Sequence, residues 1–509
     1  MQATTDWKKK PESLKGFSSF YEVMLMEISV LKQPAKPGAA SVNLLFEGDR
    51  AEGVQFSKED FSAKPGEACI IRNSGVSILV GLGKKADFED ERIRQAAGAF
   101  VYASKKTSAK SFVVQLPAFE KADDFVASRN FAEGAILASY EFSKYKERKA
   151  EDKASLEGKE VLLKPAKSVQ RAEDGLRIGK VMAQAANYAR DLNNEPGNVA
   201  NPEYMAHKAI ALAKKHGLSC KVINTTELAK MGLHGIAYVG AGSDVPGRMV
   251  VLEYSSAAKA HSKDPFVFIG KGITFDSGGI SIKQIRGLEL MKWDKAGACA
   301  VLGVMKAAAE LAPNARVVGI LALAESMPSS SAFRPGDILK TGGTSIEVIT
   351  THAEGRLVVA DALSYAKDKF PDARSVVAVA SISGACVVAL GSVASGLLSP
   401  DDGLSKELEQ ASYRTGERVW RLPMFPEYAG NVEGRQADLR NSSEPSGEAG
   451  TITAAFFLKR FAGKWPWAYI DIAGTGWQTT QAVRNYYCWG PTGAGTRLCM
   501  QYLLDKSGK

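Results

Sequence analysis

Three short stretches in the second half of this chain combine side chains that bind metal ions with side chains that carry a positive charge. They contribute three carboxylates, a histidine, two lysines and an arginine: Asp276, Asp294, Glu354, His352, Lys271, Lys283 and Arg356. Carboxylates and imidazole are ligands for divalent cations, and a positioned cation stabilises negative charge that develops during a reaction. If the fold brings the three stretches into one pocket, the set predicts hydrolysis assisted by two metal ions.

The third stretch has its chemically active residues at every second position, His352, Glu354 and Arg356. In an extended segment all three side chains would point to the same side. His352 and Glu354 could then bind a metal ion, and Arg356 could hold an anionic group.

The other two stretches each allow a structural alternative. Asp276 is followed by Ser-Gly-Gly, which would place its carboxylate on a flexible turn where the backbone can approach an ion closely. Asp294 lies just before a helix expected from residue 296, where an aspartate often caps the helix instead. Lys271 and Lys283 could each be a surface lysine, as most lysines are. Their place near a strand end, a glycine turn and acidic residues favours a functional role.

Two regions of alternating strands and helices must position these stretches. In the first region, residues 1–172, apolar runs predict strands and one segment of helical periodicity predicts a βαβ unit. The expected strands are 21–26, 41–46, 77–81 and 111–116, and the expected helix is 91–102. The charged residues 144–167 are interpreted as a solvated helix and linker, followed by a long helix at 171–192. We therefore expect a smaller α/β domain that ends near residue 172.

The second region, residues 173–509, predicts a larger α/β domain. Its apolar strands alternate with helices, which is typical of a mostly parallel sheet covered by helices on both faces. The expected strands are 220–223, 249–254, 266–270, 315–323, 375–380 and 468–472, and the expected helices are 202–216, 296–311, 357–369 and 450–461. Ligands in such sheets bind beyond the carboxyl ends of the strands. Lys271 directly follows one of these strands and Glu354 lies just before a helix, so both are expected at that edge.

Composition argues against several other classes of protein. The chain has 509 residues, of which 45% are hydrophobic and 24% charged, as in ordinary globular domains. Its net charge of +9 is spread thinly, with no basic run longer than Lys8-Lys9-Lys10, which argues against a nucleic-acid-binding face. Residues 376–400 carry no charge but are rich in serine and glycine, so we expect no membrane span. Six cysteines without a Cys-x-x-Cys pair, and an N-terminus without an apolar signal region, indicate a reduced cytoplasmic or, alternatively, mitochondrial chain.

Taken together, the three stretches resemble the signature of the leucyl aminopeptidases, a cytosolic family of two-metal peptidases. The resemblance rests on Gly270-Lys-Gly-Ile-Thr-Phe-Asp-Ser-Gly-Gly-Ile-Ser-Ile-Lys283, Met291-Lys-Trp-Asp294 and Ala353-Glu-Gly-Arg-Leu. Further matching motifs begin at Ala189, Ser326, Arg334, Gly416 and Asp471. The resemblance covers nearly all of residues 180–509, whereas the first 170 residues match only in general character.

This resemblance implies a role for each residue. The metal ligands would be Lys271, Asp276, Asp294 and Glu354. Two of them, Asp276 and Glu354, would bridge two divalent ions, zinc or alternatively manganese. Lys283 would stay charged and stabilise the oxyanion that develops on the scissile carbonyl, and Arg356 would hold a bicarbonate that relays a proton. The resemblance also implies peptide substrates with a free α-amine and an apolar, leucine-like first residue. It further implies a homohexamer, with the N-terminal domain in an oligomerisation or regulatory role.

The third stretch departs from the family, which normally has a metal-binding aspartate where this chain has His352. Three carboxylates leave one negative charge fewer against two dications, so the more loosely held ion should bind less tightly. A hard ion such as Mn²⁺ would lose most, whereas imidazole suits Zn²⁺. We therefore predict that His352 is a metal ligand, through its ring or through its backbone carbonyl. The segment Ser381-Ile-Ser-Gly384 also departs from the Thr-Leu-Thr-Gly that lines the family's substrate cleft.

Three functions remain open on the sequence. The first is a working aminopeptidase with an altered metal preference, which the presence of both lysines and Arg356 favours. The second is a catalytically weakened or inactive relative that serves as a structural scaffold, which His352 suggests. The third is a hexamer that also binds DNA, against which the lack of a basic stripe argues. Peptidase activity with added metals separates the first two, and salt-dependent retention on DNA tests the third.

Overall fold

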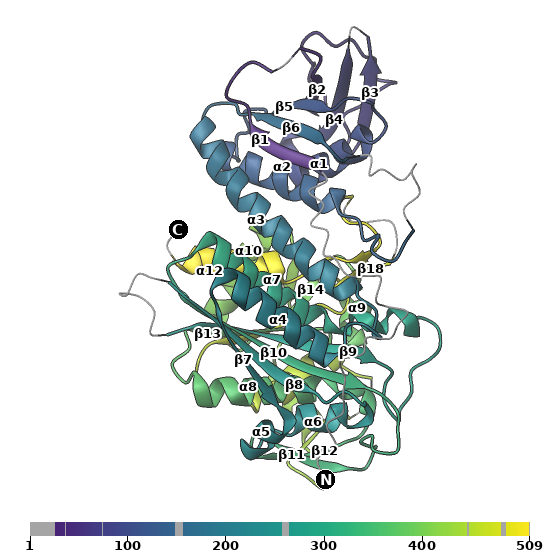
Figure 1. Ribbon diagram of the computed structural model, residues 1–509, viewed down its shortest axis with the longest axis vertical. Helices are drawn as coiled ribbons and strands as arrows, with labels where there is room; N and C mark the ends of the chain where they lie inside the picture. Colours follow the sequence, from purple (N-terminus) through teal and green to yellow (C-terminus); the bar gives the residue numbers. More distant parts are fainter. Residues whose placement is uncertain are drawn as a thin grey trace. The chain divides into compact units, whose positions relative to one another are not determined.

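A computed structural model describes residues 26–35, 37–73, 75–147, 156–256, 264–444, 447–479 and 485–507. The chain divides into two compact units, Met1–Leu176 and Arg177–Lys509. Each unit contains a sheet whose strand pairs are mostly parallel, with helices beside it, which confirms the predicted fold class (Figure 1). Among the described residues, no helix is both long and apolar enough to cross a membrane.

The first unit is built on a six-stranded sheet in the order β1-β6-β5-β2-β4-β3, in which β3 pairs antiparallel with β4 and the other pairs are parallel. Its strands are β1 Met26–Val30, β2 Ala40–Phe46, β3 Ala68–Arg72, β4 Val76–Gly83, β5 Ser111–Gln115 and β6 Lys159–Lys164. Its helices are α1 Glu91–Ser104 and α2 Asp124–Ser139, and α3, Val169–Asn194, begins in it. The strands predicted at 41–46, 77–81 and 111–116 and the helices predicted at 91–102 and 171–192 are confirmed. Of the strand predicted at 21–26, residues 21–25 lie outside the described residues.

The prediction of a solvated helix and linker at 144–167 is wrong for its second half. Residues 159–164 form β6, which pairs with β1 on one side and β5 on the other. Val161 and Leu163 are fully buried, as expected for one face of a strand. The third inward position is Lys159, whose ammonium donates to the carbonyls of Ser104 (2.6 Å) and Thr107 (3.0 Å). Because one inward-facing position of β6 is a lysine, the sequence does not show the alternation of apolar and polar residues that is typical of a strand.

The second unit is built on an eight-stranded sheet in the order β15-β14-β17-β13-β9-β10-β8-β7. The central strands β10, β9, β13 and β17 are parallel, and β8 and β14 pair antiparallel with β10 and β17. The strands are β7 Ser219–Asn224, β8 Arg248–Ser255, β9 Phe266–Asp276, β10 Arg316–Ser326, β13 Ser375–Ala380, β14 Ser395–Leu398, β15 Val419–Arg421 and β17 Trp467–Asp471. A three-stranded sheet contains β11 Ile338–Thr341, β12 Thr344–Glu347 and β16 Leu439–Arg440. A two-stranded sheet contains β18 Trp477–Gln478 and β19 Gly490–Pro491.

Helices cover both faces of the large sheet. One face carries α4 Pro202–His216, α7 Ala296–Leu311, α10 Asp402–Thr415 and α12 Thr496–Ser507 (Figure 1). The other carries α5 Thr225–Lys230, α6 Gly235–Val239, α8 Gly355–Lys369 and α11 Gly450–Lys459. A further helix is α9 Gly384–Leu390, and short 3-10 helices are η2 Lys85–Asp87, η3 Gly240–Gly242, η4 Leu288–Lys295, η5 Thr351–Ala353 and η6 Pro426–Val432. The four helices predicted in this region are confirmed.

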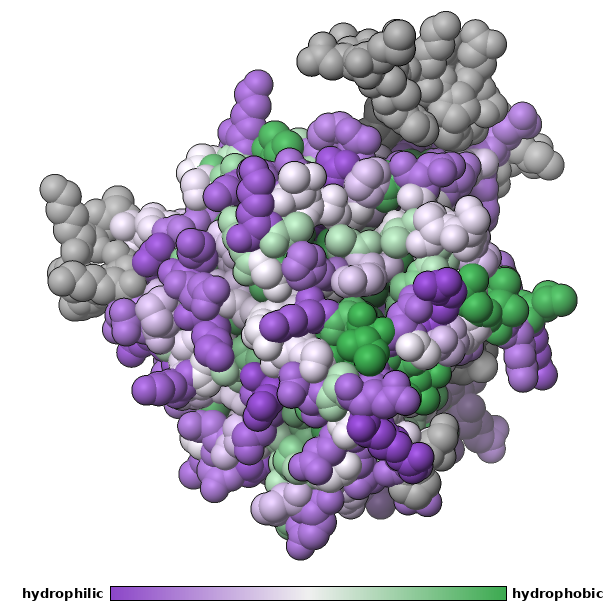
Figure 2. Space-filling model, turned by 90° about the horizontal axis from the view of Figure 1, so that it is seen from below, coloured by the Kyte–Doolittle hydropathy of each residue, from purple (hydrophilic) through white to green (hydrophobic). Residues whose placement is uncertain are grey.

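Strand β9 shows why the central strands have near-continuous apolar sequences. Phe266 and Phe268 pack into the apolar layer on one face of the sheet, and Val267 and Ile269 pack into the layer on the other. A strand that is buried on both faces needs apolar residues at every position. The outer surface differs: the face drawn in Figure 2 is covered mainly by hydrophilic side chains, with hydrophobic ones in small separate groups.

Candidate metal centre

Strand β9 carries two of the predicted site residues. It continues past the predicted end at residue 270 to Asp276, and it pairs with β10 as far as Ser326. Lys271 and Asp276 therefore lie on the strand itself, which corrects the expectation that the strand ends before Lys271 and that Asp276 lies on a turn. Polar residues in the buried second half of the strand interrupted the apolar run on which the prediction relied.

Asp294 reaches the same region from η4. The alternative role as a helix cap is not the one observed, because Lys295 occupies the cap position of α7 and makes no side-chain cap hydrogen bond. The Asp294 carboxylate instead accepts a hydrogen bond of 2.7 Å from the hydroxyl of Ser381, which directly follows β13. Asp294 is 5% exposed.

The third stretch is not extended, so the condition under which its three side chains would point to one side is not met. Thr351–Ala353 form the 3-10 turn η5, and Glu354 then occupies the N-cap position of α8 without a side-chain cap hydrogen bond, so residues two apart point in different directions. Glu354 and Arg356 are buried, whereas His352 is exposed. The His352 ring lies beside the backbone of Gly278, where a Cβ atom would be 3.1 Å from its Cε1 atom.

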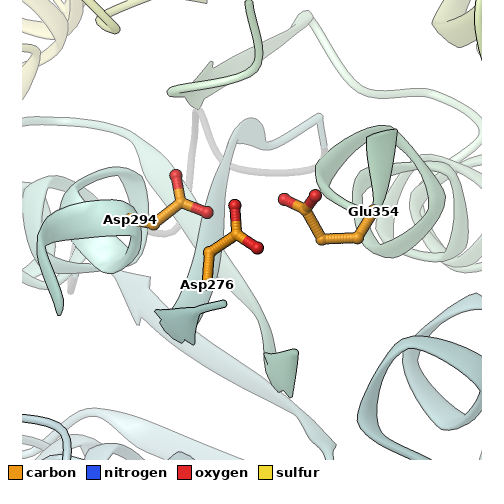
Figure 3. Close-up of side chains that lie close together, drawn as sticks. All are labelled: Asp276, Asp294 and Glu354. Atoms are coloured by element: carbon orange, nitrogen blue, oxygen red, sulfur yellow. The ribbon is translucent and has the colours of Figure 1, made fainter. Parts of the chain in front are cut away.

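Asp276, Asp294 and Glu354 meet at the carboxyl end of the sheet. One carboxylate oxygen of each lies within 4.8 Å of those of the other two, and none of the three residues is more than 5% exposed. Figure 3 shows the three carboxylates pointing toward one another from the end of β9, from η4 and from the start of α8. In the described part of the chain, His352 is not a member of this group.

Two lysines neutralise part of the charge of the carboxylates. The ammonium of Lys271 lies 2.7 Å from Asp294 Oδ2 and 3.0 Å from Glu354 Oε1, and it donates to the carbonyl of Ser381 at 2.7 Å. Lys271 is 2% exposed, so it is no surface lysine. Lys283 forms an ion pair with Asp276, and its side chain is 25% exposed. It thus joins the group from the accessible side.

The three acids do not shift alike: the pKa of Asp294 and of Asp276 is raised, whereas that of Glu354 is lowered, because Lys271 and Lys283 outweigh its burial. Burial raises the pKa of Asp294 to about 7, although Lys271 opposes the shift. Burial, followed by the charge on Glu354, also raises the pKa of Asp276. For Lys271, burial lowers the pKa, but the carboxylates of Asp294 and Glu354 outweigh it, so that its pKa is raised. Three buried acids this close together therefore require nearby positive charge in order to ionise.

The group fits divalent cations. One oxygen of Glu354, Oε2, is buried and accepts no hydrogen bond from the described residues. A buried charged oxygen without a donor is costly unless a cation contacts it. Three convergent carboxylates with a free oxygen lone pair are the hard donor set that divalent ions prefer.

Arg356 is a second buried centre of charge next to the carboxylates. It is 5% exposed, and its Nε and Nη1 atoms are buried without a hydrogen-bond acceptor among the described residues. Its guanidinium lies 5.8 Å from the centre of the Phe457 ring. Burial lowers its pKa to about 10, so the group remains charged near neutral pH. Two unused donors on a buried cation could hold a small anion.

From the sequence, no contact with this group was predicted for two residues that support it, Ser381 and Thr351. Ser381 contacts both Asp294 and Lys271, and the hydroxyl of Thr351 hydrogen-bonds the glycine turn after β9. Ser381 could have been found, because it is the first residue beyond a predicted parallel strand. Thr351 carried no recognisable signal, since its role depends on a contact with residues far away in the sequence.

Comparison with known proteins gives the family. The description "Cytosol aminopeptidase family, catalytic domain" matches residues 187–500, and "Cytosol aminopeptidase family, N-terminal domain" matches residues 32–149. The chain belongs to the cytosol aminopeptidase family, whose members are metal-dependent hydrolases of the metallo-aminopeptidase class.

Individual relatives extend over nearly the whole chain. It is 38% identical over 503 residues to the "Probable cytosol aminopeptidase" of Aquifex aeolicus (strain VF5), covering 95% of this chain and 99% of that protein. It is 41% identical to the protein of the same description from Geobacter sp. (strain M21), covering 88% and 90%. Among solved structures, "Bottromycin maturation enzyme BotP in complex with Mn" aligns with a TM-score of 0.83 and 32% identity, covering 92% of this chain and 100% of that one.

Proposed function

We propose that this protein is a two-metal aminopeptidase that removes apolar, leucine-like residues from the free N-termini of peptides. The observation that carries the proposal is the group of three buried carboxylates with two lysines at the carboxyl end of the sheet. The proposed metal ligands are Lys271, Asp276, Asp294 and Glu354. Two divalent ions held there would act as a Lewis acid on the scissile carbonyl and would lower the pKa of water, so that it could lose a proton and become a nucleophile at neutral pH.

The two lysines would have different duties. Lys271 lies deep in the group, where it serves as counter-ion to Asp294 and Glu354. A dication would replace this positive charge and favour the neutral amine, which can then act as a ligand. The ammonium of Lys283 lies 3.3 Å from the sulfur of Met291, and its side chain is 25% exposed, so it would be accessible to a peptide bound at this site. We assign to it the stabilisation of the developing oxyanion, which is worth most in a site that excludes water.

Arg356 would bind a small anion beside the carboxylates. Its buried Nε and Nη1 donors support this role, and bicarbonate is the anion that the family resemblance implies. A bicarbonate held there could pass a proton between the attacking water and the leaving amine.

His352 favours a second candidate function, an inactive relative that serves as a scaffold. Its side chain is exposed and lies outside the group of carboxylates, which leaves the site one acidic ligand short of the family pattern. The backbone carbonyl of residue 352 could still contribute a ligand, and zinc would tolerate the change better than manganese. Everything else in the proposed catalytic set is present, and for that reason we prefer the enzyme.

The remaining proposals follow from the family. We infer a homohexamer with the unit Met1–Leu176 in its assembly or regulation, a cytoplasmic location, and zinc as the preferred metal. Manganese is the alternative, since a similar structure is described as a complex with Mn.

The direct test measures hydrolysis of leucine p-nitroanilide by the metal-free protein after addition of Zn²⁺, Mn²⁺ or Mg²⁺. The Glu354→Gln variant is the matched control, because it keeps the size of the side chain and removes its charge. We expect metal-dependent turnover in the wild type and a loss of about 10³-fold or more in the variant. Absence of turnover with every metal would favour the scaffold.

A further inference from the structure

The glycine turn after β9, residues 277–283, places Lys283 at the site. Its ends are joined by a hydrogen bond of 2.9 Å from the Lys283 amide to the Ser277 carbonyl. The Gly278 amide donates to Asp276 Oδ1 at 2.8 Å, so the turn also touches a proposed metal ligand. The position of this turn therefore sets the geometry of both Asp276 and Lys283.

The outer side of this turn has little packing of its own. Ile280 and Ile282 are 45% and 62% exposed, and Ile285, just beyond it, is 88% exposed. Gly278 and Gly279 have φ angles of +90° and +66°, in the left-handed region that glycine enters without strain. Glycines with large positive φ do not hold a turn rigid by themselves. Whatever fixes the turn must act from its inner side.

Thr351 occupies that inner side. It is fully buried, and its hydroxyl donates to the Gly278 carbonyl at 2.5 Å and accepts from the Ser281 amide at 2.8 Å. The Thr351 amide in turn donates to the Ser281 hydroxyl at 3.3 Å. A Cβ atom on Gly279 would lie 3.2 Å from the Cβ atom of Thr351, so the two backbones are in close contact.

We propose that Thr351 is a positioning residue that fixes the glycine turn, and thereby Asp276 and Lys283, relative to Glu354. Its place in the sequence suits this role, because Glu354 lies only one turn of backbone further on. Without the hydroxyl, the Gly278 carbonyl and the Ser281 amide would lose their partner. The turn would then be held less firmly, by the bonds of Ser277 to the Ser326 carbonyl and of the Thr351 amide to the Ser281 hydroxyl. The catalytic consequence rests on the function proposed above, but the structural consequence does not.

The experiment compares Thr351→Val, which keeps the shape and removes the hydroxyl, with Thr351→Ser, which keeps the hydroxyl. Thr341→Val is the matched control. Thr341 is also fully buried, accepts a hydrogen bond of 3.0 Å from the His234 amide and donates one to Asp361. The Thr341→Val variant shows how far loss of a buried threonine hydroxyl elsewhere in the fold changes the exchange rates and the activity.

The first readout is hydrogen exchange at the Gly278 and Lys283 amides, neither of which bonds to Thr351 directly. We expect at least tenfold faster exchange at both in Thr351→Val, with rates close to wild type in Thr351→Ser and Thr341→Val. Unchanged exchange in Thr351→Val would overturn the proposal, and so would equal acceleration in Thr341→Val. This readout needs neither metal nor turnover, so it decides the proposal even if the protein proves not to be a peptidase.

The second readout is the response to metal and substrate. Residues that hydrogen-bond to metal ligands, without contacting the metal themselves, typically contribute 10–100-fold to metal affinity or activity. We expect Thr351→Val to lower kcat about 10–100-fold with KM within about threefold, and Thr351→Ser to restore most of the rate. A fall in rate that Thr351→Ser does not restore would contradict positioning through the hydroxyl. A wild type without activity would refute the proposed function but not the exchange result.

Discussion

At the scale of single residues, the site is a balance of buried charge. Burial and the charge on Glu354 make Asp276 and Asp294 harder to ionise, and Lys271 and Lys283 offset that cost. Removal of one partner of a buried ion pair leaves an uncompensated buried charge and strongly destabilises the folded protein. The acids therefore depend on the lysines, and the lysines on the acids. Divalent ions could take over the role of Lys271, whereas Lys283 contacts the group from the accessible side. In the function proposed above, Lys271 would therefore be a metal ligand and Lys283 a group that contacts the substrate.

Replacement of Lys283 by Met tests whether Lys283 stabilises the oxyanion and is not a metal ligand. The variant keeps the length of the side chain and removes its charge, so we expect kcat to fall about 10²–10³-fold, as for loss of an oxyanion-stabilising donor. KM and metal content should change little. The measurement is steady-state kinetics with metal analysis of the same preparation, and Lys340→Met, an exposed lysine, is the control. If the variant lost its metal instead, the assigned role of Lys283 would be wrong.

At the scale of elements, close packing of helix α7 on the sheet holds Asp294 in place. A Cβ atom on Gly297, at the start of α7, would lie 2.1 Å from the carbonyl oxygen of Val379 on β13. Another on Gly270 of β9 would lie 2.5 Å from the Gly297 carbonyl oxygen. These glycines let the backbone that follows Asp294 approach two central strands directly.

Gly297→Ala should therefore be destabilising although the change is small. The added methyl group cannot be accommodated without a backbone shift, and overpacking of this kind costs about 1–3 kcal/mol or more. Denaturant unfolding measures the loss. Gly430→Ala is a suitable control, because a Cβ atom there meets nothing within 4 Å, and we expect it to change stability by less than about 0.5 kcal/mol. Equal stability of the two variants would contradict the packing described.

Asp361 joins helix α8 to the start of α6, and it predicts a dependence of stability on pH. Its carboxylate accepts from the Gly235 and Ile236 amides at 3.0 and 2.8 Å and from the Thr341 hydroxyl. Burial raises its pKa from 3.8 to about 6 against these hydrogen bonds. The folded state thus binds the proton more tightly than the unfolded state does. Asp361 contributes stability that is fully present below pH 3.8 and is lost as the pH rises through 6.

The test compares unfolding of the wild type with that of Asp361→Asn from about pH 4 to pH 7, since the other titrating groups are common to both. We expect the stability of the wild type relative to the variant to fall by about 1–3 kcal/mol across this range. A relative stability that instead grew with pH would mean that the hydrogen bonds dominate and that the pKa is lowered.

The sequence predicted the elements well where apolar periodicity is uninterrupted, as in α4, α7 and β13. It failed where polar residues are buried. Lys159 concealed β6, and Lys271 concealed the second half of β9, because a buried lysine with partners is indistinguishable in sequence from an exposed one. The residues Asp276, Asp294 and Glu354 could be predicted from their motifs. The orientation of His352 could not, because it depends on η5, a turn of three residues.

At the scale of the whole molecule, the chain consists of two α/β units, and the carboxylate group lies entirely within Arg177–Lys509. The family assignment covers both units, with matches to residues 32–149 and 187–500. The second unit thus contains every residue to which we assign a part in the reaction.

The most direct measurement is the metal content of the purified protein together with its peptidase rate, for the wild type and for His352→Asp. We predict two ions per chain and a measurable rate in the wild type, with tighter binding of manganese in the variant because a fourth carboxylate is restored. One ion or none in the wild type with no rate, together with activity gained in His352→Asp, would contradict the account. That result would mean that this chain has kept the fold of the family and lost its reaction.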